Sequence, residues 1–213
     1  MIRTILVAMV LLAAPVLVLG APEIEEGAQY EAVVPEMPGA EGNRIKVIEF
    51  FWYGCGHCFA FEPYLEKWLE QKPDDVDFVR VPAMFNRPDV ILHAKVFYTL
   101  NLIGADPSIH NKIFDALNVQ HKRLGTEQEM EEFLQANGVD KYKFRDAMKS
   151  FAVENSIRKA AVLAEDYDIR GVPEMAVDGK YKFGGLEGGL MIDVLNHLVD
   201  KVRKDKAVAG ASK

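Results

Sequence analysis

Apolar and polar positions follow two different periodicities along this chain, and the changes between them mark its elements. Runs rich in β-branched and aromatic residues predict strands at 46–51, 76–84 and 174–177. Apolar residues at helical spacing predict a helix after residue 58, a long helical region from 88 to about 167, and a last helix from 190 to about 204. Asp178-Gly179 is a hairpin turn signal that joins 174–177 to a partner strand at 180–183.

The order of these elements predicts an α/β fold. A strand–helix–strand start implies a parallel pair with a crossover helix. The helical region is too long for a connection, so we expect an inserted all-α subdomain at 89–169. The segment 22–43, acidic and rich in Pro and Gly, is expected to be an N-terminal extension with a possible edge strand at 29–34, and 207–213 a flexible tail.

Residues 1–21 have the pattern of a secretory signal peptide. Arg3 is followed by an apolar run from Ile5 to Leu19 and by small residues at the expected cleavage site. The run is shorter than the roughly 20 residues that span a bilayer. We therefore expect a cleaved signal, with an uncleaved membrane anchor as the alternative.

The net charge argues against nucleic acid as a partner. The chain of 213 residues has a formal net charge of −7 with His neutral, whereas nucleic-acid binding typically needs an excess of basic residues. Export would bring it into an oxidising compartment, where disulfides persist.

The two cysteines of the chain, Cys55 and Cys58, lie where the first strand gives way to a helix. A bridge between positions i and i+3 closes a very short loop and stabilises a fold little. A structural zinc site needs four ligands, and there is no second Cys pair and no paired histidines, so we expect no metal. The pair is therefore predicted to be a redox couple.

The position of each cysteine relative to the helix N-terminus predicts its role. The free N–H groups and dipole of this terminus favour negative charge, so Cys55, the closer of the two, is expected to be the nucleophilic thiolate. Cys58, one turn inside, is expected to be buried and to act as the resolving thiol. His57 would stabilise the thiolate, the alternative being a solvated spacer.

Two charged residues, one in each strand, lie among apolar residues where a buried strand is expected. Glu49 and Arg80 each lie in a run expected to be buried. We expect an ion pair beneath the helix N-terminus, where Glu49 could tune Cys58 or move its proton. The alternative is that both side chains reach solvent at strand ends.

Two segments of the chain resemble the signature sequences of a known protein family. The segment from Glu49 to Cys58, EFFWYGCGHC, followed by Phe59 and Phe61-Glu62, resembles the active-site segment of the DsbA family, and Gly171-Val172-Pro173-Glu174-Met175 resembles its second signature. The resemblance implies a thioredoxin fold, built from 44–88 plus 170–206 and interrupted by the helical insertion. It also implies thiol:disulfide oxidoreductase activity that needs no cofactor beyond the Cys55–Cys58 disulfide.

The resemblance further implies a cellular location and partner proteins. The protein would be a periplasmic monomer that gives disulfides to unfolded exported proteins with free thiols and is reoxidised by a DsbB-like membrane partner. A cis bond at Pro173 would expose the backbone of Val172 to a substrate strand. Trp52 and Phe59 would add an apolar docking surface, unless they serve ordinary core packing.

Two departures from the family's usual sequence predict that this protein is a weaker oxidant than is usual for the family. Gly56 stands where the family usually has proline, and Gly-His is the dipeptide of protein disulfide isomerases. Glu174 places a carboxylate next to the predicted cis bond, where it would disfavour a thiolate at Cys55. Isomerase or reductase activity is therefore the main alternative. A binding or chaperone module with incidental redox chemistry is a further alternative, and it would keep its function in Cys55→Ser.

Overall fold

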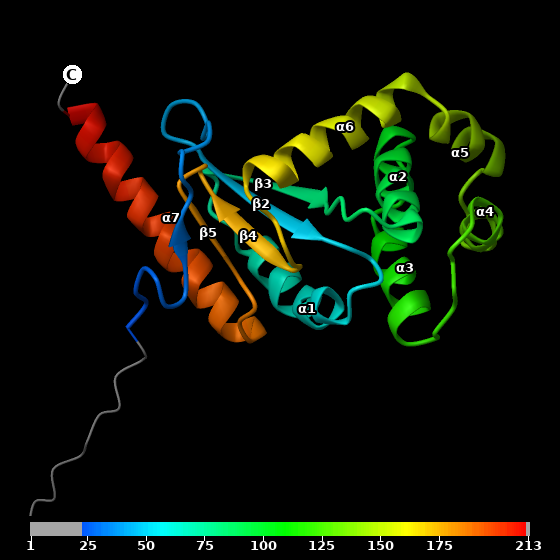
Figure 1. Ribbon diagram of the computed structural model, residues 1–213, viewed down its shortest axis with the longest axis horizontal. Coiled ribbons are helices and arrows are strands. Elements are labelled where there is room, and N and C mark those ends of the chain that lie inside the picture. The colour runs from blue at the N-terminus through cyan, green and yellow to red at the C-terminus, as the bar shows by residue number, and fades with distance from the viewer. Residues whose placement is uncertain (1–22, 212–213) are drawn as a thin grey trace, which may run out of the picture.

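A five-stranded sheet forms the centre of the fold, in the order β1-β5-β4-β2-β3 (Figure 1). The computed structural model describes residues 23–211, and the predicted signal at 1–21 lies outside them. The strands are β1 (Glu31–Ala32), β2 (Ile45–Phe51), β3 (Val76–Pro82), β4 (Glu174–Val177) and β5 (Tyr181–Gly184).

The β2 strand connects the parallel and antiparallel halves of the sheet. It pairs in parallel with β3, through the crossover helix α1 (Gly56–Glu70), and antiparallel with β4. The register places Glu49 opposite Arg80. The parallel pair is thus confirmed, but the expectation that β3 is buried is wrong. Because β3 lies at the sheet edge, Val79 is 42% exposed.

The hairpin between β4 and β5 forms as predicted. Asp178 and Gly179 have φ values of +51° and +73°, the left-handed pair that a two-residue turn of this kind requires. On the outer side β5 pairs with β1, which is two residues long and shorter than the possible strand at 29–34.

Helices cover both faces of the sheet. On one face α1 and α7 (Gly188–Ala211) bury Val47 and Met175; on the other α6 (Phe151–Asp166) packs over Ile48 and Phe50 (Figure 1). Helix α7 continues to Ala211, although a flexible tail was expected from residue 207. No helix within residues 23–211 is both long and apolar enough to cross a bilayer.

The predicted helical insertion lies between β3 and β4. It comprises α2 (Pro88–Leu102), α3 (Ser108–Asn118), α4 (Glu127–Ala136), α5 (Lys141–Met148) and α6. Thr126 and Glu129 form the capping box that starts α4. The apolar core of the insertion includes Phe51 and Cys58, so it is continuous with the residues around the redox pair.

Candidate active site

The N-terminus of α1 positions both cysteines. Cys55 is the N-cap residue in extended backbone geometry, and its sulfur accepts the N–H of Cys58 at 3.3 Å. Cys58 lies one turn further and is completely buried, whereas Cys55 is only half-buried. The strand–helix junction therefore leaves one sulfur open to a partner and hides the other.

The two thiols have opposite pKa shifts. The thiol of Cys58 and the backbone N–H groups of His57 and Cys58 lower the pKa of Cys55 to about 6, and the charge of His57 adds to this. Burial raises the pKa of the Cys58 thiol far above its ordinary value. At neutral pH the reduced site thus holds a thiolate at Cys55 and a protonated thiol at Cys58.

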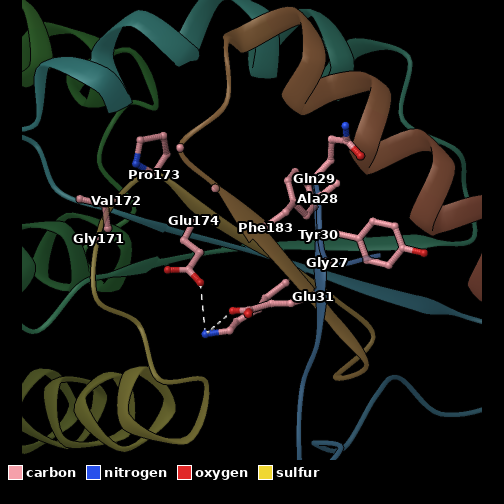
Figure 2. Close-up of a pocket in the computed structure, with 13 residues that line it drawn as sticks. Gly27, Ala28, Gln29, Tyr30, Glu31, Gly171, Val172, Pro173, Glu174 and Phe183 are labelled. Atoms are coloured by element: carbon pink, nitrogen blue, oxygen red, sulfur yellow. Dashed lines mark ion pairs between the residues drawn. The ribbon is translucent and has the colours of Figure 1, made fainter. Parts of the chain in front are cut away.

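A segment distant in sequence completes the surroundings of Cys55. The sulfur of Cys55 lies 3.3 Å from the carbonyl oxygen of Val172, to which it donates when the thiol is protonated, and the Val172–Pro173 peptide bond is cis. The next residue, Glu174, is ion-paired at 3.5 Å with Lys182, which also pairs with Glu31 at 3.1 Å. Figure 2 shows the carboxylate of Glu174 pointing toward that amine, and the pKa of Cys55 is lowered although Glu174 follows Val172 by only two residues.

Gly56 occupies a position with free space around it. A Cβ atom there would come no closer than 4.0 Å to the side-chain oxygen of Asn118. The amide of Asn118 donates to the carbonyl oxygen of Tyr53 at 2.9 Å and so ties α3 to the loop before Cys55. Glycine is therefore not required here by crowding.

The expected ion pair forms beneath α1. The Nε of Arg80 donates to Glu49 at 2.9 Å, and the carboxylate of Glu49 is completely buried, so the alternative that both groups reach solvent is wrong. The structure adds Glu62, which accepts from Arg80 at 2.8 Å. Glu62 follows Cys58 by four residues on the same helix face, a signal that the sequence interpretation missed. The Glu49 carboxylate is among the groups that raise the pKa of Cys58.

Trp52 and Phe59 are both partly engaged in packing. The indole N–H of Trp52 donates to His93 at 3.0 Å, and the guanidinium of Arg87 lies 4.8 Å from its ring centroid. Phe59 packs against the core of the helical insertion. Their expected contact with substrate therefore remains a prediction.

A groove of about 520 Å³ lies beside the redox pair. Its lining comes from α1, from the Val172–Pro173 segment and from the connection between β5 and α7 together with the first turn of α7. Sequence interpretation did not find it, because three separate segments form it. Its apolar lining residues include Phe61, Tyr64, Leu186 and Met191. No cluster of three or more His, Cys, Asp or Glu residues within 23–211 is placed to hold a metal ion.

Comparisons with known proteins identify the family of this chain. The family described as DSBA-like thioredoxin domain matches residues 46–199. Thiol:disulfide interchange protein DsbA of Pseudomonas aeruginosa is 40% identical over 86% of this chain and 88% of its own length, and that of Pseudomonas syringae is 42% identical over 91% and 90%.

Solved structures give the same result. The crystal structure of Pseudomonas aeruginosa DsbA superposes with a TM-score of 0.80 at 39% identity, covering 89% of this chain and 97% of that one. The oxidoreductase NmDsbA1 of Neisseria meningitidis reaches 0.77 at 26% identity, covering 86% and 96%. The chain therefore belongs to the DsbA family of thiol:disulfide oxidoreductases, with a thioredoxin fold interrupted by a helical insertion.

Proposed function

We propose that this protein acts as a disulfide donor for exported proteins, working in the periplasm after loss of its signal peptide. The low pKa of Cys55, about 6, is the observation that supports transfer of the disulfide from the enzyme to its substrate and not the reverse. A thiol with a low pKa is a good leaving group, so its disulfide is readily transferred to a substrate.

The geometry gives each cysteine one role in the exchange. A substrate thiolate attacks the exposed sulfur of Cys55, the Cys55–Cys58 bond breaks, and Cys58 leaves and takes up a proton. The second thiolate of the substrate then attacks its own sulfur in the mixed disulfide. Cys55 leaves as a thiolate, the substrate has lost two electrons, and the enzyme pair has gained them. A DsbB-like membrane partner would accept these electrons from the monomeric enzyme.

Two surfaces beside Cys55 fit an unfolded substrate. The carbonyl oxygen of Val172 faces the sulfur and can accept a backbone N–H of an extended chain. The groove along Tyr64, Leu186 and Met191 offers apolar contacts next to it. Such a site suits chains that are still unfolded, because a folded protein keeps most of its backbone groups paired and most of its large apolar side chains buried.

Equilibration with glutathione buffers tests the direction of exchange. We expect the protein to be much more oxidising than thioredoxin measured in parallel, and to oxidise a reduced, unfolded substrate protein stoichiometrically. An equilibrium like that of thioredoxin would instead establish a reductase. Cys55→Ser is expected to abolish the transfer; retention of function in that variant would favour a chaperone.

Gly56→Pro is expected to make the protein more oxidising. Proline fixes φ near −65° at the first position of a helix, which holds the N-terminal N–H groups against the Cys55 thiolate. A Cβ atom at position 56 would come no closer than 4.0 Å to its nearest neighbour, the side-chain oxygen of Asn118. The glutathione equilibrium constant should shift by about tenfold, or roughly 1.4 kcal/mol. Gly56→Ala serves as the control, since it adds a Cβ without the ring and should change the constant less.

A further inference from the structure

Two buried carboxyl groups share one guanidinium beneath α1. Arg80 donates to Glu49 at 2.9 Å and to Glu62 at 2.8 Å, and the exposed fractions of the three side chains are 18%, 0% and 7%. If both carboxyl groups were ionised, the cluster would carry an uncompensated negative charge in a site shielded from water. Such a charge costs several kcal/mol, so the cluster is expected to hold one proton.

The unpaired atoms of the cluster indicate where this proton lies. The Oε1 atoms of Glu49 and Glu62 and the Nε2 of His110 are buried and have no hydrogen-bond partner among the described residues. Glu62 Oε1 and His110 Nε2 lie 3.5 Å apart. A proton between these two atoms would give each of them a partner, and a small movement would bring them to ordinary hydrogen-bond distance.

The second ring nitrogen of His110, Nδ1, has a partner that is compatible with a proton shared at Nε2. This nitrogen lies 2.9 Å from the hydroxyl of Tyr53, which can either donate or accept. The ring is held among the aromatic rings of Phe51, Phe97 and Phe114, 5.1–6.2 Å away between centroids. His110 therefore keeps Nε2 directed at α1 whichever of its nitrogens carries hydrogen.

We infer that Glu62 and His110 share the buried proton of this cluster, which leaves Glu49 ionised against Arg80 and free to exchange a proton with Cys58. His110 is then a positioning residue for the redox pair, acting through Glu62. This inference rests on the proposed role of Cys58 as the resolving thiol. When Cys58 attacks a mixed disulfide, its proton passes to Glu49, the bond to Cys55 forms, and the substrate leaves as a thiolate.

The charges around His110 favour a proton on the carboxyl side. Burial lowers the pKa of His110 to about 3, and Arg80 adds to this, while Glu49 and Glu66 oppose it. Burial raises the pKa of Glu49 and of Glu62 alike to about 7 despite Arg80, so the contact of Glu62 with His110 decides which of the two carboxyl groups holds the proton. The groups that face His110 are thus Glu62 and Glu66 from α1, Glu49 from β2, Arg80 from β3 and the neutral Tyr53. The acid O–H would donate to Nε2.

Infrared spectroscopy of the intact, reduced protein at pH 6 tests the assignment. A protonated carboxyl group has a C=O stretch that an ionised one lacks. We expect this band in the parent protein, and we expect it to vanish in both Glu62→Gln and Glu49→Gln, because either change leaves a single carboxylate for Arg80 and removes the need for a shared proton. Because burial also raises the pKa of Glu174, all proteins compared would carry Glu174→Gln. Absence of the band from the parent protein, or its persistence in Glu62→Gln, would overturn the inference.

Replacement of His110 separately tests whether this residue accepts the hydrogen bond from protonated Glu62. In His110→Gln the band should shift in frequency, and its titration midpoint should move by about one pH unit, a tenfold change in the ionisation constant. His110→Asn is a second variant in case the first does not fold, and the exposed His197→Gln is the matched control. An unchanged band and midpoint would refute the role of His110. The band does not depend on the direction of disulfide exchange, so failure of the donor proposal leaves this result interpretable.

Discussion

Cys58→Ala is expected to raise the pKa of Cys55 from about 6 by about 1–2 units, toward the ordinary value near 8.5. The buried thiol of Cys58 makes the largest contribution to the low pKa, and alanine removes it. The backbone N–H groups of His57 and Cys58 stay, so part of the shift should survive. The ultraviolet absorbance of the thiolate, followed against pH in the reduced protein, measures the midpoint.

Cys58→Ser is the matched control for this titration. Its hydroxyl can still donate to the Cys55 sulfur, so its midpoint should lie between those of the reduced wild type and Cys58→Ala. The same shift has a consequence for stability. Because the fold lowers the pKa of Cys55, the reduced protein should gain stability as the pH rises above about 6 and cease gaining above the unfolded value near 8.5. Identical midpoints in the three proteins would contradict the assigned contact.

Arg80→Met is expected to destabilise the fold by about 3–5 kcal/mol at pH 8, because it leaves Glu49 and Glu62 buried without their cation. Burial already raises the pKa of both carboxyl groups to about 7, and loss of Arg80 should raise it further. A carboxyl group with a raised pKa is protonated in the fold and ionised in the unfolded chain, so stability falls as the pH rises from about 4.3 through the folded pKa. The penalty should therefore be much smaller at pH 5.

Urea unfolding at pH 5 and pH 8 measures this difference. Arg203→Met is the control: its ion pair with Asp75 is partly exposed, so its loss should cost less than about 1 kcal/mol at either pH. Adding Glu49→Gln to Arg80→Met should recover part of the stability at pH 8, since it removes one of the two unpaired charges. A penalty independent of pH would indicate lost packing of the Arg80 side chain and not unpaired carboxylates.

The features that sequence predicted are those with local causes. The hairpin at Asp178-Gly179 depends on two residues that adopt positive φ, and the placement of Cys55 and Cys58 depends on a strand that ends just before a helix. The pairing of Glu49 with Arg80 could be predicted because an isolated charge in an apolar strand needs a partner.

The features that sequence missed are those made by tertiary contact. His110 reaches Glu62 only because α3 packs against α1, and no pattern in either segment points to the other. The groove beside Cys55 gathers residues from three separate segments. The edge position of β3 follows from the order of strands, which the apolar content of the strand alone does not specify.

The contact between Cys55 and Val172 bears on how the protein tolerates mutation. The acceptor is a carbonyl oxygen of the main chain, so its presence does not depend on which side chain stands at position 172. A substrate that replaced the thiol at this oxygen would likewise offer a peptide N–H, the group that nearly all amino acids share. Under the proposed function, recognition at this point would therefore not depend on the substrate's sequence, and one enzyme could serve many different substrates without a separate contact for each.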